Sequence, residues 1–267
     1  MAQIGLLKDL LLGRVPDRGP DFFIAGATRS GTTYLHHLLG VHPDVFMPGT
    51  KELHYFDNDR RYREDLSGYR RRFHGYRGER LIGEATPSYM MHEWKAHRNG
   101  VAMARIGRHF PDAKIIISLR DPLTRAVSQY EKNFLQGRVS AGIADELAAE
   151  DRGSSRLRLI YQNSYDIHIA SVFDHFPQEA VRFLVFEEWT KAVPETAASL
   201  AEFLGLRPLA NWPVPEKKAQ NDRNRYRRVS EVPPALDDAS RDKIVAGTAA
   251  GRRFVEALLG RKMPWAC

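Results

Sequence analysis

Short apolar runs alternate along the chain with longer segments of helical spacing. The most apolar runs are FFIAG (22–26), LIGEA (81–85), KIIISLR (114–120) and VRFLVFEEW (181–189). Runs that stay apolar at successive positions are typical of strands buried on both faces, as in a parallel sheet. The pattern therefore predicts an α/β fold with a central, mainly parallel sheet.

Amphipathic segments between these runs predict helices that flank the sheet, at about 32–41, 97–110, 122–135, 163–176, 194–206 and 238–260. Asp121 and Pro122 suit the N-cap and first turn of one helix, and Gly205 suits the end of another. Residues 207–235 are rich in Pro, Lys, Arg and Asn, so we expect a loop there.

The chain has 267 residues, which fits one large α/β domain with a full core. We expect a single domain over 1–267, with its core at about 20–265 and an N-terminal extension at 1–19. The apolar run of that extension is too short to span a membrane, and it lacks the features of a signal peptide. The only cysteine is the last residue, which excludes an internal disulfide. We therefore expect a soluble, cytoplasmic protein without a membrane partner.

Basic residues are in excess and clustered. Lys and Arg number 40 against 33 Asp and Glu. Eight arginines lie within 60–80, and six Lys or Arg lie within 217–228. Such clusters indicate an anionic ligand or a polyanionic acceptor, although a solvated basic surface also explains the first cluster. The usual nucleic-acid motifs are absent, so we expect no nucleic-acid partner.

The segment GATRSGTT (26–33) lies between a predicted strand and a predicted helix. Backbone amides in such a turn, together with the helix N-terminus, bind phosphate oxygens. The spacing from Gly26 to Gly31 equals that of a Walker A loop, but Thr32 stands where that loop has lysine, and Arg29 is the cation inside it. We therefore predict a P-loop-like turn that binds a donor without a triphosphate. The alternative is a turn that only caps the helix.

A second motif, ISLRDPLTRAVSQY (117–130), begins within the third apolar run. Arg120 ends the predicted strand, and Ser128 lies about two turns into the next helix, so both can bind one phosphate. Pairing of Arg120 with Asp121 or Glu131 is the alternative. The two motifs together imply two phosphate pockets, as adenosine 3′,5′-bisphosphate (PAP) would need. No His, Cys and Asp cluster has metal-ligand spacing, and we expect no metal.

These segments resemble the sulfotransferases that use 3′-phosphoadenosine-5′-phosphosulfate (PAPS). TRSGTTYLHHLLGVHPDVFM resembles their 5′-phosphosulfate loop, and LRDPLTRAVSQY resembles their 3′-phosphate motif. TKELHYFDN (50–58) is similar to the K-E-x-H-F-F segment of the heparan sulfate N- and 3-O-sulfotransferase type. The resemblance runs from about Phe22 to Trp265. It implies PAPS as co-substrate, and an acceptor hydroxyl or amine on a saccharide, a natural product or another small molecule.

The resemblance also implies roles for single residues. The 5′-phosphosulfate would be bound by Arg29, Ser30, Gly31, Thr32 and Thr33, and the 3′-phosphate by Arg120 and Ser128. Glu52 would be the catalytic base, while Arg29 and His54 would stabilise charge at the reacting centre.

Two of these catalytic roles have alternatives. Glu52 could be a surface partner of Lys51, with His54, Asp57 or Glu84 as the base instead. His54 could be a buried structural histidine.

One position departs from the family pattern. The 3-O-sulfotransferases have a K-[ST]-P segment that supplies a lysine, and this chain has Ala85 followed by Thr86 and Pro87. Arg29, Lys51 or an arginine of 60–80 could supply the charge instead. Two rival functions remain at this point: a P-loop kinase, which the loop spacing favours, and a non-catalytic polyanion-binding module, which the basic clusters favour.

Overall fold

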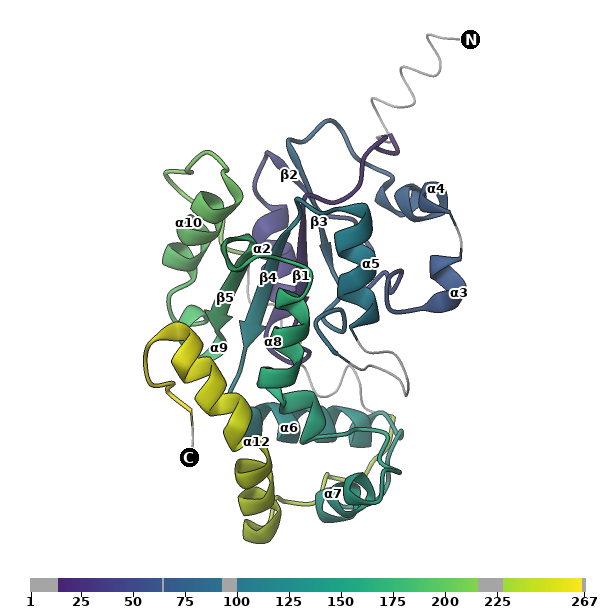
Figure 1. The fold of residues 1–267 in the computed structure, drawn as a ribbon, viewed down its shortest axis with the longest axis vertical. Helices are drawn as coiled ribbons and strands as arrows, with labels where there is room; N and C mark the ends of the chain where they lie inside the picture. Colours follow the sequence, from purple (N-terminus) through teal and green to yellow (C-terminus); the bar gives the residue numbers. More distant parts are fainter. Residues whose placement is uncertain (1–13, 64, 93–99, 216–227, 266–267) are drawn as a thin grey trace. The chain divides into compact units, whose positions relative to one another are not determined.

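Five parallel strands form the central sheet in a computed structural model of the chain, in the order β2-β3-β1-β4-β5 (Figure 1). The structure describes residues 14–63, 65–92, 100–215 and 228–265. The strands are β1 (Phe22–Gly26), β2 (Val45–Phe46), β3 (Leu81–Ala85), β4 (Lys114–Leu119) and β5 (Val181–Val185). The predicted α/β class with a mainly parallel sheet flanked by helices is confirmed.

The described chain divides into two compact units. The first contains residues 14–119 and 171–215, and it holds the whole sheet. The second contains residues 120–170 and 228–265. The single domain expected over 1–267 stays a prediction.

In the first unit, the side chains of β1 alternate between the two faces of the sheet. Phe22 and Ile24 pack in one core cluster with α2 (Thr32–Gly40) and α10 (Val193–Leu204). Phe23 points to the other face, where its ring meets those of Phe56, Tyr89 and Phe110. In Figure 1, α5 (Val101–His109) lies in front of the sheet and α2 behind it. Both faces of β1 are therefore buried, as the run of apolar residues predicted.

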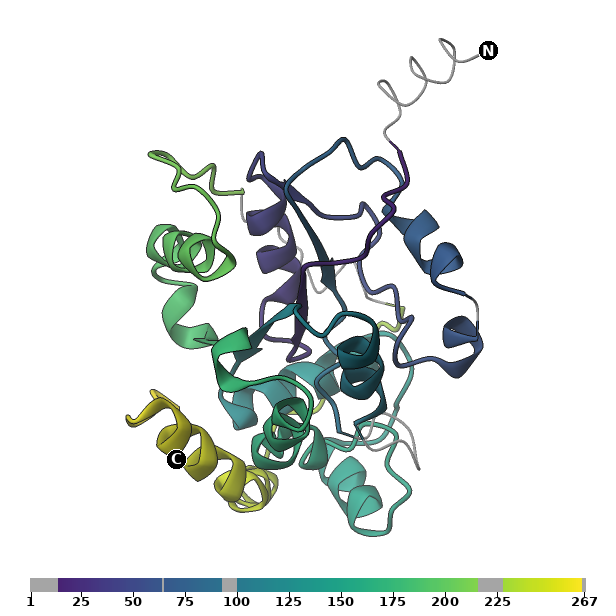
Figure 2. The same cartoon turned by 45° about the horizontal axis from the view of Figure 1, so that its top comes forward.

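The second unit consists of helices and their connections. Its elements are α6 (Pro122–Leu135), α7 (Ile143–Asp151), the 3₁₀ turn η2 (Tyr161–Asn163), the start of α8 (Tyr165–Phe173) and α12 (Asp238–Leu259). Helix α12 packs against α6, α7 and η2 (Figures 1 and 2). The predicted start of α6 is confirmed, because the side chain of Asp121 accepts a hydrogen bond from the amide of Leu123 and Pro122 lies in the first turn.

The strand predicted at 181–189 is too long. β5 ends at Val185, and Phe186–Trp189 form the helical turn α9. The amide and hydroxyl of Thr190 both donate to the carbonyl of Phe186, at 3.2 and 2.7 Å, which closes the turn. Trp189 is buried by this turn, so the apolar pattern of the segment reflects burial at the end of the sheet rather than a longer strand.

The other predicted elements differ mainly at their ends. The helix predicted at 163–176 is α8 (Tyr165–Phe173), and the helix predicted at 97–110 is α5, with residues 97–99 outside the described residues. The loop expected at 207–235 is irregular over 207–215 and 228–235, and its residues 216–227 are likewise outside.

Some short elements had no sequence prediction. They are β2, α3 (Asp59–Tyr62), α4 (Leu66–Arg70), α7 and the 3₁₀ turns η1 (Arg71–Phe73), η2 and η3 (Gln178–Ala180). Apart from α7, which has nine residues, each is too short to show a hydrophobic period. In the part of the chain that the structure describes, no helix is long and apolar enough to cross a membrane.

Candidate active site

The loop between β1 and α2 has the geometry of an anion-binding turn. Gly31 stands at the N-cap of α2 with a φ of 77°, and no side chain caps the helix. The first-turn amides of α2 are therefore available to an anion at the positive end of the helix dipole. Within the loop, the Ser30 hydroxyl is buried without a hydrogen-bond partner among the described residues. The loop thus offers donors that suit a phosphate or sulfate group.

A chain of hydrogen bonds fixes this loop to the sheet. The indole N–H of Trp189 donates to the hydroxyl of Ser118 at 2.8 Å, and that hydroxyl donates to the carbonyl of Ser30 at 2.7 Å. The amide of Ala27 donates to the carbonyl of Ser118 at 2.8 Å. Ser118 lies near the end of β4 and is fully buried. The loop is therefore positioned by the neighbouring strand and by α9, not only by its own turn.

The segment that follows β2 lies at the same edge of the sheet as the loop. The amide of Glu52 donates to the carbonyl of Ala85 at 3.0 Å, so this segment is bound to the end of β3. β3 pairs in parallel with β1, with Ala85 opposite Ile24, and the carboxyl ends of parallel strands share one edge. Glu52 and the phosphate loop thus belong to neighbouring strand ends within the first unit.

Charged side chains of this segment form a connected network. The ammonium group of Lys51 lies 2.7 Å from one carboxylate oxygen of Glu52, and Nε2 of His54 lies 3.8 Å from the other. Nδ1 of His54 is 2.9 Å from the carboxylate of Asp57, which also accepts a hydrogen bond from Ser88 at 2.5 Å. The hydrogen bond to Asp57 raises the pKa of His54, although burial opposes it. The network therefore favours a charged imidazolium beside Glu52.

The accessibility of the three carboxylates differs sharply. The side chain of Glu52 is 48% exposed, whereas that of Asp57 is 4% exposed and Glu84 is 1% exposed. The two oxygens of Glu84 accept hydrogen bonds from the hydroxyls of Tyr69 and Thr86, at 2.5 and 2.6 Å, and burial raises its pKa to about 7. Of these groups, Glu52 is the one that an acceptor molecule can reach.

Backbone conformation distinguishes the same residues. Four non-glycine residues of the described chain have positive φ, and three of them are Arg29 (65°), Glu52 (62°) and His54 (50°). The left-handed region costs an L-residue free energy, and such residues are enriched at functional sites. This strain coincides with the three residues that the sequence assigned to catalysis.

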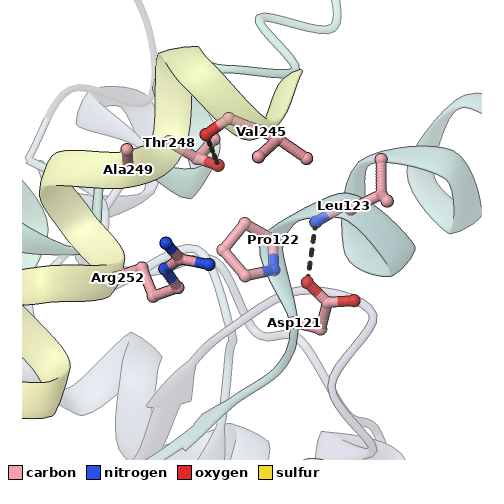
Figure 3. Close-up of a pocket in the computed structure, with 7 residues that line it drawn as sticks. All are labelled: Asp121, Pro122, Leu123, Val245, Thr248, Ala249 and Arg252. Atoms are coloured by element: carbon pink, nitrogen blue, oxygen red, sulfur yellow. Dashed lines mark hydrogen bonds between the residues drawn. The ribbon is translucent and has the colours of Figure 1, made fainter. Parts of the chain in front are cut away.

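Arg120 and Ser128 lie in the second unit. Arg120 follows the last residue of β4, and its Nε donates to the hydroxyl of Thr124 at 3.2 Å. Ser128 is half-buried on α6. A small pocket beside the N-terminus of α6 has room for about one water molecule, so it is not a nucleotide site (Figure 3).

Sequence reasoning missed several residues that shape the site. Ser118 and Trp189 hold the phosphate loop, Ser88 supports Asp57, and the hydroxyl of Tyr165 binds the backbone of Arg120. Two of the four had a sequence signal, because Ser88 follows β3 closely and Ser118 lies near the end of β4, where ligands bind in open α/β sheets. Trp189 and Tyr165 had none.

The fold and the strand-end loop define an α/β protein with a P-loop-like turn. The chain belongs to the sulfotransferase family, whose model, described as "Sulfotransferase family", matches residues 20–210. Its structure is similar to the crystal structure of a sulfotransferase from Alicyclobacillus acidocaldarius, with a TM-score of 0.71 and 26% identity over 92% of this chain and 97% of that one.

Curated relatives include heparan sulfate glucosamine 3-O-sulfotransferase 3A1 of Homo sapiens, 31% identical over 74% of this chain and 47% of the relative. Membrane-associated sulfotransferase kil1 of Dictyostelium discoideum is 35% identical over 42% of this chain and 22% of the relative. The chain thus spans about half or less of the length of these relatives.

We expect Gly31→Ala to destabilise the protein. A Cβ at this position would lie 2.4 Å from the ring of Trp189, and the backbone has positive φ. The backbone conformation should cost about 1–2 kcal/mol and the clash about 1–3 kcal/mol more in the free energy of unfolding, measured by urea denaturation. Gly153→Ala is the matched control, because Gly153 has a φ of 68° and no atoms near its Cβ position. Equal losses in both variants would show that Trp189 does not constrain the loop.

Proposed function

We propose that this chain is a PAPS-dependent sulfotransferase that transfers a sulfuryl group to a hydroxyl, or an amine, of a saccharide or another small molecule. Membership of the sulfotransferase family supports the reaction class. The observation that carries the proposal is the placement of the phosphate loop and Glu52 at neighbouring strand ends, with Glu52 bound to β3 beside β1.

The loop favours PAPS over a nucleoside triphosphate as donor. A Walker A loop reaches the β- and γ-phosphates with the lysine that follows its second glycine, and Thr32 stands there instead. Arg29, inside the loop, suits a single 5′-phosphosulfate. The uncapped start of α2 and the buried Ser30 hydroxyl fit the same group. A P-loop kinase is therefore the less favoured function.

Glu52 is proposed to act as the general base. Its carboxylate takes the proton of the acceptor hydroxyl as the acceptor oxygen bonds to sulfur. In the same in-line step the bond from sulfur to the 5′-phosphate oxygen breaks, and that oxygen keeps the electron pair. Arg29 stabilises the negative charge that develops on this leaving oxygen.

His54 is proposed to support the charge at the reacting centre. Asp57 orients the ring through Nδ1, and this contact raises the pKa of His54. The imidazolium form then presents Nε2 toward Glu52, 3.8 Å away. A positive group at this distance helps to hold Glu52 in its ionised form before the proton is taken.

Lys51 is proposed to supply the charge that the family lysine gives at the position of Ala85. The backbone hydrogen bond from Glu52 to Ala85 brings the segment that contains Lys51 to the end of β3. The side chain of Lys51 is 14% exposed, and burial lowers its pKa, while its contact with Glu52 raises it. The pairing of Lys51 with Glu52 is thus compatible with a role for both residues in the site.

We predict that PAP stabilises the protein and that ATP with Mg²⁺ does not. A ligand at a hundredfold excess over its dissociation constant adds about 2.7 kcal/mol, which should raise the melting temperature by about 5–10 °C. Differential scanning fluorimetry measures this shift. A larger shift with ATP and Mg²⁺ would support the kinase, and a shift with heparin alone would support the polyanion-binding module.

We predict that Glu52→Gln lowers the turnover of a hydroxyl acceptor by about 10²-fold or more, since the amide cannot take a proton. The affinity for PAP should stay near that of the wild type. The acid limb of the pH–rate profile should disappear as well, because it reports protonation of this carboxylate. An acceptor screen with labelled PAPS, read by mass shift, identifies the substrate for these rates.

Two further variants separate the rival roles. Glu195→Gln removes an exposed carboxylate from the first turn of α10 and should leave turnover unchanged. His54→Gln should lower the rate but keep the acid limb. Turnover of Glu52→Gln within a few-fold of the wild type would mean that Glu52 is only a partner of Lys51.

A further inference from the structure

The side chain of Tyr165 binds both polar groups of the backbone of Arg120. The hydroxyl of Tyr165 accepts a hydrogen bond from the amide of Arg120 at 3.2 Å and donates one to the carbonyl of the same residue at 2.8 Å. Both polar groups of one residue are thus bound by one oxygen atom. Arg120 stands between the end of β4 and the start of α6, where no ladder of helix or strand hydrogen bonds fixes the chain.

Tyr165 is itself held rigidly. It is fully buried and is the first residue of α8. Helix α12 approaches its backbone at Gly251, where an added Cβ would lie 2.8 Å from the amide nitrogen of Tyr165. The indole of Trp265 packs beside the phenol ring, with centroids 5.9 Å apart. A hydroxyl carried by so constrained a ring acts as a fixed point rather than an adaptable contact.

Arg125 anchors the turn that precedes Tyr165. Its guanidinium is buried, donates from Nε to Oδ1 of Asn163 at 2.6 Å, and also donates to the carbonyl of Gln162. The same group lies 5.9 Å from the centre of the Tyr165 ring. Because Arg125 belongs to α6, these contacts bind the turn η2 to the helix that follows Arg120.

The other side of Arg120 is fixed by the helix cap. The side chain of Asp121 accepts a hydrogen bond from the amide of Leu123, and the ring of Pro122 restricts the backbone in the first turn of α6 (Figure 3). Arg120 therefore has a defined backbone on both sides, while its guanidinium reaches out to Thr124. A guanidinium on a pre-organised backbone loses less entropy when it binds a phosphate.

We infer that Tyr165 is a positioning residue for recognition of the 3′-phosphate of the donor: its hydroxyl sets the backbone of Arg120, and Arg125 anchors the turn that carries Tyr165. This inference rests on the proposed function, in which Arg120 binds the 3′-phosphate. Tyr165 acts through Arg120 and does not touch the nucleotide.

The test is Tyr165→Phe, which removes one oxygen and keeps the ring that packs on Arg125 and Trp265. Isothermal titration calorimetry gives the dissociation constants for PAP and for adenosine 5′-phosphate, which lacks the 3′-phosphate. We expect PAP to bind about three- to tenfold more weakly, the effect of losing one or two hydrogen bonds, and adenosine 5′-phosphate to bind within twofold of the wild type. If Tyr165 had a purely structural role, the variant would bind both ligands more weakly by the same factor.

Tyr130→Phe is the matched control. Tyr130 is equally buried in the second unit. Its hydroxyl donates to the carbonyl of Ala141 at 3.0 Å, and not to the backbone of Arg120. This variant should keep the wild-type ratio of the two dissociation constants. In the background of Arg120→Ala, Tyr165→Phe should have no further effect on PAP, because the two residues act in series.

The outcomes distinguish this inference from the proposed function. A wild-type protein that prefers PAP to adenosine 5′-phosphate supports the 3′-phosphate site. The role of Tyr165 is refuted if Tyr165→Phe then keeps that preference, or if it weakens PAP binding by the same factor in the wild-type and Arg120→Ala backgrounds. Either result leaves the donor assignment standing. A wild-type protein without any preference for PAP refutes both.

Discussion

The contact on which the first unit depends is the buried chain from the indole of Trp189 through the hydroxyl of Ser118 to the carbonyl of Ser30. Arg29 has positive φ in this loop, which is unfavourable for a residue with a Cβ, and a buried polar group is costly to leave without a hydrogen-bond partner. The indole, the hydroxyl and the carbonyl satisfy one another. They bind the phosphate loop to β4 and to α9, and so set the direction of the first-turn amides of α2.

The rest of the site follows from burial, which separates groups of the same chemistry. Glu84 and Asp57 are buried carboxylates with hydrogen-bond partners inside the protein. Tyr69 and Thr86 bind the two oxygens of Glu84, and His54 and Ser88 both contact Oδ2 of Asp57. Glu52 keeps an accessible carboxylate on a segment bound to the end of β3. The three carboxylates are chemically alike. Their proposed roles therefore differ because of their exposure and their hydrogen bonds.

Local signals predicted the fold class, the phosphate turn and the start of α6, because glycine spacing, apolar runs and Asp-Pro caps act over a few residues. Contacts between distant residues were beyond such signals. Trp189 contacts Ser118, which lies 71 positions away in the sequence. The local pattern does not show this contact, and residues 186–189 were therefore predicted as strand although they form α9. Tyr165 lies 45 positions from Arg120, and no pattern in the sequence connects a tyrosine to the backbone of an arginine so far away.

We propose that the loop before α2 receives the 5′-phosphosulfate of PAPS and that Arg120 receives its 3′-phosphate. A crystal structure with PAP bound tests this most directly, because it locates both phosphates at once. We expect the 5′-phosphate on the amides of Gly31, Thr32 and Thr33, and the 3′-phosphate within hydrogen-bond distance of Arg120 and Ser128. A nucleotide bound elsewhere, or one whose 3′-phosphate faces solvent, would contradict the account.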